Sequence, residues 1–262
     1  MPNTIEEELF CTRYELDTLS GIVNLGMLER WIPGYCGVHT HREHIARYNW
    51  VKQFVENKIV ADLACGSGFG SLTLANDGKA SIVYAGDIDS RTVKYASIKN
   101  KHQNINFAVK NGEDFELAEE VEVFVSFETI EHLSNPNKFL ENVQKSIKKN
   151  GQFVVSTPIS NIPINNNPEN IHHRIEWGFL QFQELVNNYF TIKEVYLQLY
   201  KHPKPLSNKL INRGLRKLIP QPIKEKLIER IEPFKWVESE IPVSELGNSW
   251  TGYQILICEL KF

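Results

Sequence analysis

The sequence predicts an α/β protein whose core is a doubly wound, mostly parallel sheet of seven strands. Short apolar runs alternate along the chain with segments of helical periodicity, which is the pattern of parallel strands joined by crossover helices. Carboxylates, amides or glycines follow most of these runs, at the sheet edge where such folds bind their ligands. The predicted strands are residues 59–64, 81–85, 105–109, 121–127, 153–156, 191–199 and 253–260.

The first strand leads into the most distinctive segment of the chain, Ile59–Gly70, with the sequence IVADLACGSGFG. Its apolar run includes Asp62, and from Gly66 onward every second residue is a glycine. Glycines at this density allow a ligand to approach the backbone over the N-terminus of the helix that follows. The spacing is G-x-G-x-G rather than the dinucleotide-binding G-x-G-x-x-G. The carboxylate favours a cationic ligand over a pyrophosphate.

Caps and turns place the remaining core helices. Ser90 caps a helix that runs to about Lys101. Asn135-Pro136 begins a helix whose basic last turn and terminal glycine are expected at Lys148–Gly151. A further helix over residues 178–189 precedes the sixth strand.

An N-terminal helical extension, residues 1–56, precedes the core. Residues 6–19 and 21–31 show mixed helical spacing, and residues 39–55 carry a clearer apolar stripe. The core is expected to span residues 57–200.

A helical insertion before the last strand occupies residues 201–250, and the last strand completes the core over residues 251–262. Residues 207–219 and 223–231 are expected to be short helices rich in basic residues. We interpret the insertion as a lid or a homodimer surface. The alternative is contact with an anionic substrate or with lipid head groups.

Composition excludes several classes of protein. A formal net charge of -3 argues against non-specific binding to nucleic acid. Four scattered cysteines without a CxxC pair indicate reduced thiols in a cytoplasmic protein rather than a disulfide framework. The first residues lack the features of a signal peptide, and no run approaches the ~18–20 apolar residues of a membrane span, so no stable membrane insertion is expected.

Residues 40–200 resemble the class I methyltransferases, which have a Rossmann-like fold and use S-adenosylmethionine (SAM). Asp62-x-Ala64-x-Gly66-x-Gly68 resembles their first motif, with Ala64 in place of a glycine. Asp87-Ile88, then NINFAVKNGEDF, then SFETIEHL resemble later motifs in the same order. EHIARY, which contains Arg47, resembles a segment that lies over the methionine end of the cofactor.

The resemblance implies a role for each matched residue. Asp87 would accept the ribose hydroxyls, Ile88 would pack on the adenine, and Asn111 would accept the adenine amino group. Arg47 would hold the cofactor carboxylate, with a surface salt bridge as the alternative. The implied cofactor-binding residues are Arg47, Asp62, Ala64, Cys65, Gly66, Ser67, Gly68, Asp87, Ile88, Asn111, Gly112, Glu113, Phe127, Glu128 and His132.

Patterns that the sequence lacks narrow the chemistry. No Asn/Asp-Pro-Pro-aromatic run follows the fourth strand, so methylation of nucleic-acid bases is not expected. The carboxylate pairs of metal-assisted enzymes are not evident. The cluster His39, His41 and His44 matches no metal-ligand spacing and is interpreted as a solvated helix face. We therefore expect no catalytic metal.

Transfer of a methyl group to a hydroxyl needs a base that removes the proton of the acceptor. Histidine titrates near neutral pH, and histidines follow both the fourth and the fifth strand. NIHHRIEW resembles the segment that closes over the acceptor in sugar and small-molecule O-methyltransferases. We expect His172 or His173 to be the base, with His132 as the second choice. A structural or substrate-lining role is the alternative for each of the three.

The sequence therefore predicts a SAM-dependent methyltransferase that releases S-adenosylhomocysteine. By resemblance, the expected acceptor is a hydroxyl of a sugar or surface-polysaccharide precursor, including anionic or nucleotide-linked sugars. A quinone-pathway O-methyltransferase is the second enzyme hypothesis. An NAD-dependent oxidoreductase or epimerase would want a glycine where the chain has Ser71. A non-catalytic SAM-binding protein is the last alternative.

Overall fold

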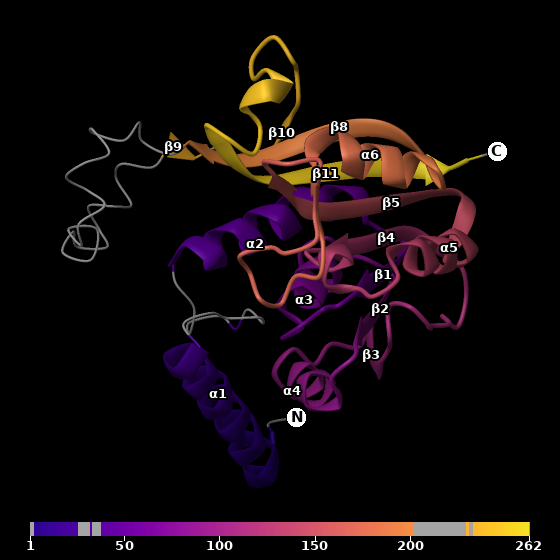
Figure 1. Cartoon of the computed structure of the whole chain (residues 1–262). Helices are drawn as coiled ribbons and strands as arrows, with labels where there is room; N and C mark the ends of the chain where they lie inside the picture. Colours follow the sequence, from indigo (N-terminus) through magenta and orange to yellow (C-terminus); the bar gives the residue numbers. More distant parts are fainter. Residues whose placement is uncertain (1–2, 26–31, 33–37, 202–228, 231–232, 262) are drawn as a thin grey trace.

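The core of the molecule is one twisted sheet (Figure 1). The computed structural model describes residues 3–25, 32, 38–201, 229–230 and 233–261. Seven long strands follow the order β3-β2-β1-β4-β5-β11-β8. They are β1 (Ile59–Leu63), β2 (Ile82–Asp87), β3 (Ile105–Val109), β4 (Val121–Phe127), β5 (Ile147–Ser160), β8 (Phe190–Lys201) and β11 (Trp250–Leu260).

Strand direction confirms the doubly wound, mostly parallel sheet. β1 to β5 pair in parallel, whereas β11 runs antiparallel to both β5 and β8. Short strands extend the sheet: β10 (Phe234–Lys235) and β9 (Glu229–Arg230) pair with β8. β6 (Ile164–Asn165) and β7 (Glu176–Gly178) pair with each other, and β7 also pairs with the end of β5.

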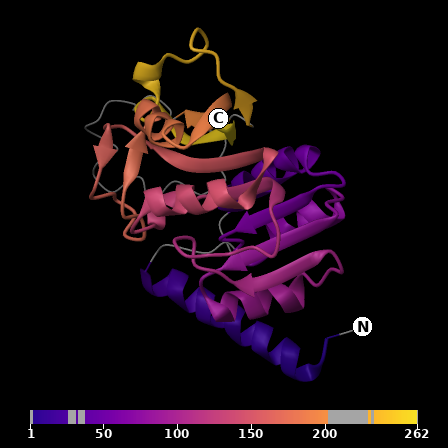
Figure 2. The same cartoon turned by 90° about the vertical axis from the view of Figure 1, so that its right-hand side faces the viewer.

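Helices cover both faces of the sheet because the buried strands are apolar on both sides (Figures 1 and 2). On one face, α2 (Val38–Val51), the short helix η1 (Lys52–Phe54) and α3 (Phe69–Asn76) enclose one hydrophobic cluster. On the other face, α5 (Pro136–Ser146) and α6 (Phe179–Asn187) enclose a second one.

The N-terminal helix α1 (Ile5–Leu25) lies beside α4 (Ser90–Lys99), at the β3 edge of the molecule (Figure 1). Tyr14 stacks on Tyr95 with ring centroids 4.6 Å apart, and the hydroxyls of Tyr14 and Thr92 are 2.7 Å apart. The expectation of two separate helices, over residues 6–19 and 21–31, is wrong at their junction, since α1 runs without interruption to Leu25. A glycine inside a helix costs only about 1 kcal/mol, which tertiary packing readily offsets. Residues 26–31 of the second expected helix lie outside the described residues.

The expected last turn of α5 is also wrong. The helix ends at Ser146, and Ile147 already begins β5, where it pairs with Val121. A Cβ on Gly151 would meet Ile147 Cγ2 at 2.5 Å and the Glu122 carbonyl oxygen at 3.0 Å. This glycine therefore permits a close approach across an irregular pair of strands and does not cap a helix.

The helix expected over 207–219, and most of the helix expected over 223–231, lie outside the described residues. Glu229–Arg230 is a strand, so the end of the second helix is wrong. Further along, Trp236, Ile241 and Leu246 belong to a third apolar cluster with Leu197 and Leu199 of β8. Within the described part of the chain, no helix has the length and apolar character to cross a bilayer.

Candidate active site

A cavity of about 390 Å³ lies at the carboxyl ends of β1, β2, β4 and β5, where a doubly wound sheet binds its ligands. The loops after these strands, α2 and β11 supply its walls. The sequence-predicted residues that line it are Ala64, Cys65, Gly66, Ser67, Asp87, Ile88, Asn111, Gly112, Phe127, Glu128, His132 and His173. Arg47, Asp62, Gly68, Glu113 and His172 are not among its lining residues.

The loop after β1 turns through left-handed backbone conformations. Ala64, Gly66 and Gly68 have φ angles of 63°, 54° and 81°. For an alanine this conformation costs roughly 1–2 kcal/mol, so Ala64 is a strained residue at the cavity wall. A Cβ on Gly68 would meet Ala96 Cβ at 2.8 Å and the Phe107 ring at 2.9 Å. Gly68 therefore packs the loop against α4 and β3, away from the cavity.

Asp62 lies behind the loop. The Tyr48 hydroxyl donates to Oδ1 at 2.9 Å, and Ser71 Oγ donates to Oδ2 at 2.6 Å. The side chain is fully buried, and this burial raises the pKa of Asp62 to about 6, against the two hydrogen bonds, which lower it. Its position suits a role in shaping the loop through α2 and α3.

The end of β2 supplies a carboxylate and an apolar side chain to the same cavity. Asp87 accepts the Gly66 N–H through Oδ2 at 3.1 Å and the Asp89 N–H through Oδ1 at 3.0 Å. Its carboxylate thus joins the end of β2 to the glycine loop. Ile88 is 63% exposed and offers an apolar surface at the cavity.

Beyond β3, Asn111 lines the cavity and Glu113 turns away from it. Asn111 Oδ1 accepts the Glu113 N–H at 3.0 Å. The Glu113 carboxylate accepts the N–H groups of Ser134 and Asn135 at 2.5 and 3.0 Å. It therefore fixes the chain just before α5, where orphan N–H groups need an acceptor.

Arg47 is completely buried, so the alternative of a surface salt bridge is wrong. Its Nη1 donates to Gln198 Oε1 at 2.8 Å, and its guanidinium lies 4.6 Å from the centre of the Tyr253 ring. Its Nε and Nη2 are buried without a hydrogen-bond partner among the described residues. The Arg47 charge lowers the pKa of Glu43, but burial outweighs it and raises that pKa to about 7.

The loop after β4 carries two carboxylates, the partly buried Glu128 at the cavity wall and the fully buried Glu131. Glu128 has a φ of 51°, a strained conformation directly after the strand, and accepts a 2.6 Å hydrogen bond from Ser156 Oγ. Glu131 is fully buried, and Thr157 Oγ1 donates to its Oε2 at 3.3 Å. Its Oε1 is buried and has no hydrogen-bond partner among the described residues. Burial raises the pKa of Glu131 well above its ordinary value.

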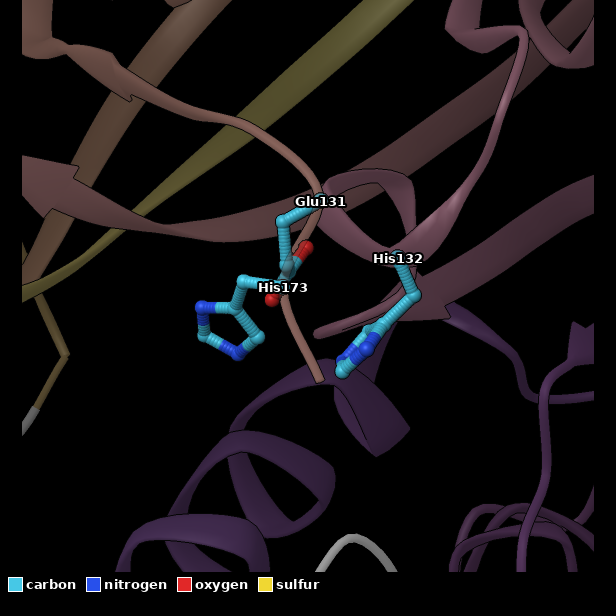
Figure 3. A group of neighbouring side chains, drawn as sticks. All are labelled: Glu131, His132 and His173. Atoms are coloured by element: carbon cyan, nitrogen blue, oxygen red, sulfur yellow. The ribbon is translucent and has the colours of Figure 1, made fainter. Parts of the chain in front are cut away.

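Two histidine rings face this carboxylate, and Figure 3 shows Glu131 extending between them. His132 Nδ1 lies 2.9 Å from the His172 carbonyl oxygen, so Nδ1 carries the proton. His173 Nδ1 lies 2.6 Å from Glu176 Oε1, and the Asn170 amide donates to its Nε2 at 2.8 Å. The two rings are perpendicular, with centroids 4.8 Å apart.

The structure thus separates the three candidate bases. His132 and His173 line the cavity, whereas His172 contributes its backbone to the contact with His132. The chain after β5 is held here because the N–H groups of Arg174 and Ile175 donate to the Glu131 carbonyl oxygen at 2.8 and 3.3 Å.

Several cavity residues were missed by sequence reasoning: His44, Tyr48, Leu63, Gly70, Lys110, Thr129, Leu133, Pro158, Asn170 and Tyr253. The interpretation of His44 as part of a solvated face is wrong, since it lines the cavity one helical turn before Tyr48. That spacing of four was a usable signal. No such sequence signal marked Tyr253, because this residue reaches the cavity only through the pairing of β11 with β5, in which it lies opposite Pro158. The side chains of His39 and His41 lie outside the described part.

Comparisons with known proteins agree with this geometry. A family model described as a methyltransferase domain matches residues 54–196. A probable S-adenosylmethionine-dependent methyltransferase of Mycolicibacterium smegmatis is 28% identical over 162 residues, covering 60% of this chain and 62% of that protein. A ubiquinone biosynthesis O-methyltransferase of Rickettsia akari is 33% identical over 100 residues, covering 37% of this chain and 39% of that protein. The chain thus spans less than two thirds of the length of either relative.

Among solved structures, the N-methyltransferase NodS from Bradyrhizobium japonicum in complex with S-adenosylhomocysteine superimposes with a TM-score of 0.58. The match covers 96% of this chain and 99% of that one at 11% identity, so it concerns the fold alone. Sheet order and cavity position define a class I, Rossmann-like methyltransferase fold. The chain belongs to the methyltransferase-domain family, and the cofactor of this SAM-dependent family is S-adenosylmethionine.

Proposed function

We propose that this protein transfers a methyl group from SAM to a hydroxyl of a small molecule. The observation that carries the proposal is one continuous cavity with two chemically different ends. One end has the glycine loop and Asp87, and the other has His132 and His173, with the buried carboxylate of Glu131 close to both rings. A donor at the first end and an acceptor at the second would meet in one shared space, which is the main requirement of a displacement reaction.

The residues at the first end suit the parts of SAM. The Asp87 carboxylate is an acceptor for the ribose diol, Ile88 offers an apolar face for the adenine, and Asn111 offers an amide for its amino group. Glu128 would add negative charge to a cavity that takes a sulfonium and an ammonium group. Arg47 remains our candidate for the cofactor carboxylate, through the guanidinium nitrogens that the described residues leave unpaired; because Arg47 is completely buried and does not line the cavity, the side chains that cover it would have to move.

The reaction requires one displacement and one proton transfer. The acceptor oxygen forms a bond to the methyl carbon while the carbon–sulfur bond breaks and its electron pair stays on sulfur. The hydroxyl proton goes to a base, and His173 is the better placed of the expected histidines. Its Nδ1–H is held by Glu176, so Nε2 carries the lone pair, and the acceptor hydroxyl would displace the Asn170 amide that donates to it. The Glu176 carboxylate would stabilise the imidazolium that forms.

For the acceptor we propose a hydroxylated sugar or a surface-polysaccharide precursor, which the polar groups at the histidine end of the cavity would suit. A quinone-pathway phenol or catechol is the second candidate, and the similarity to a ubiquinone biosynthesis O-methyltransferase favours it. Release of S-adenosylhomocysteine, measured with nucleotide-linked sugars on one side and catechols and hydroquinones on the other, would decide between them.

The cofactor assignment is tested by calorimetric titration with SAM, S-adenosylhomocysteine and NAD. We expect the wild type and the matched control Asp77→Ala to bind the first two with micromolar affinity, because Asp77 lies on the surface, 3.8 Å from Lys52. Asp87→Ala should lose this binding, because the carboxylate would accept the ribose hydroxyls and because it also holds the Gly66 N–H of the glycine loop. Binding of NAD instead would contradict the proposal.

The role of the histidines is tested by comparing two neighbours. His173→Ala should lower turnover by roughly 10²–10⁴ while SAM affinity is kept. His172→Ala should have a much smaller effect, because it keeps the carbonyl oxygen that accepts from His132. If His173→Ala has no lower turnover than His172→Ala, His173 is not the base.

A further inference from the structure

Three potential metal ligands lie together at the histidine end of the cavity: His132 and His173 line it, and Glu131 is fully buried next to them. One carboxylate oxygen of Glu131, one ring nitrogen of His132 and one of His173 lie within 4.8 Å of one another. Adjacent ligands of a cation with bonds of about 2.1 Å are about 3.0–3.4 Å apart, so the three side chains would have to move closer together by up to about 1.8 Å to contact one ion. The three residues come from two segments, the loop after β4 and the chain after β5 (Figure 3).

Both histidines are oriented as metal ligands usually are. His132 donates its Nδ1–H to a backbone carbonyl oxygen, and His173 donates its Nδ1–H to the carboxylate of Glu176. These are the two partners that commonly fix the tautomer of a ligating histidine.

Glu131 supplies an independent observation. Its side chain is fully buried, yet its Oε1 has no hydrogen-bond partner among the described residues, and its Oε2 has only a long contact with Thr157. A buried acceptor without a donor is costly, and a bound cation would remove that cost. The Asn170 amide occupies the Nε2 lone pair of His173 in this structure, so a cation has to displace this one hydrogen bond.

We propose that Glu131, His132 and His173 bind a divalent transition-metal cation at the acceptor end of the cavity. Two imidazoles and one carboxylate favour Zn²⁺, Fe²⁺, Co²⁺ or Mn²⁺ over Mg²⁺ and Ca²⁺, which prefer oxygen ligands. This replaces the sequence-based expectation that the protein has no catalytic metal.

The role of the cation rests on the proposed methyl transfer, whereas its binding does not. With three protein ligands, the remaining coordination positions would face the cavity and could take the acceptor hydroxyl. The cation would lower the pKa of that hydroxyl, whose proton would pass to solvent. His132 and His173 would then act as ligands, and neither would need to act as the base.

Binding is tested on the purified, chelator-treated full-length protein. We expect Zn²⁺ to bind in calorimetry with one site per chain, and Co²⁺ to give visible absorption bands that Zn²⁺ abolishes. Glu131→Gln and His173→Asn should each weaken Zn²⁺ binding by at least about 100-fold, and Glu176→Gln by about 10–100-fold through the lost orientation of His173.

Matched controls are His172→Asn, next to the site, and His102→Asn, which lies on the β3 side of the sheet; both should keep the wild-type affinity. Glu131→Gln preserves the volume of the side chain, and His173→Asn changes a residue at the cavity wall. If one variant fails to fold, the other still tests the site.

Each outcome bears on one proposal. SAM binding with no Zn²⁺ binding, or Zn²⁺ affinity that survives in Glu131→Gln and His173→Asn, overturns the metal site and leaves the methyltransferase proposal intact. Zn²⁺ binding that the two variants lose supports the site even if SAM does not bind, and in that case the proposed function fails alone.

Discussion

Replacing Asp62 by asparagine tests how burial and hydrogen bonding compete beneath the glycine loop. The carboxylate is completely buried and accepts hydrogen bonds from Tyr48 and Ser71. Those bonds favour the ionised form, whereas burial favours the neutral form and dominates, so that the pKa rises from 3.8 to about 6. Asparagine keeps the shape of the side chain and cannot ionise.

The expected magnitude follows from this shift. A pKa that is higher in the folded than in the unfolded protein gives a stabilisation that is complete below pH 3.8 and is lost as the pH rises through about 6. At 1.36 kcal/mol per pKa unit, the loss is about 3 kcal/mol. Ser71 must reverse its hydrogen bond in the variant and lose an acceptor, which costs about 1 kcal/mol. Asp62→Asn should therefore be about 2 kcal/mol more stable than the wild type above pH 7, and slightly less stable near pH 4.

Urea denaturation of both proteins between pH 4 and pH 8 measures this directly. The difference between the two free energies of unfolding is the informative quantity, because the other titrating groups contribute equally to both proteins. The control Asp77→Asn changes a half-exposed carboxylate and should stay within about 0.5 kcal/mol of the wild type at every pH. A difference that is flat, or that falls as the pH rises, would show that the two hydrogen bonds outweigh burial and would refute the reasoning.

Two further predictions concern the same loop. Gly70→Ala should lower the free energy of unfolding in urea by about 1–3 kcal/mol, because the new Cβ would lie 2.0 Å from the ring of Tyr48. Gly112→Ala, whose nearest neighbour is at 3.4 Å, should change it by less than about 0.5 kcal/mol, and equal effects would contradict the assigned packing. Ala64→Gly should raise thermal stability by up to about 1 kcal/mol, since relief of the strained φ exceeds the added chain entropy. Ala75→Gly, inside α3, should lower it by about 1 kcal/mol, and a loss in both variants would show that Ala64 is unstrained.

Local sequence patterns were enough to predict the fold and the residues at the glycine-loop end of the cavity. A strand, a turn and a helix depend on neighbouring residues, so alternating apolar runs sufficed to predict the parallel sheet and its seven strands. The same holds for Ala64 to Ser67 and for Asp87, which immediately follow or end their strands and line the cavity. Where a boundary depended on packing, as at Gly151 or within α1, the sequence-based expectation was wrong.

The sequence by itself determined that polar groups gather at the carboxyl ends of β1, β2, β4 and β5, because parallel strands must all end at one edge. Only the tertiary structure decided which of them face the cavity. In the structure, Asp62 lies behind the glycine loop and Arg47 lies in the interior. His173 lines the cavity, whereas His172 does not. The proximity of Glu131 to His173 depends on the hydrogen bonds that the N–H groups of Arg174 and Ile175, some forty residues further along the chain, donate to the Glu131 carbonyl oxygen. Long-range contacts of this kind leave no period or spacing in the sequence, because each partner is locally an ordinary loop residue.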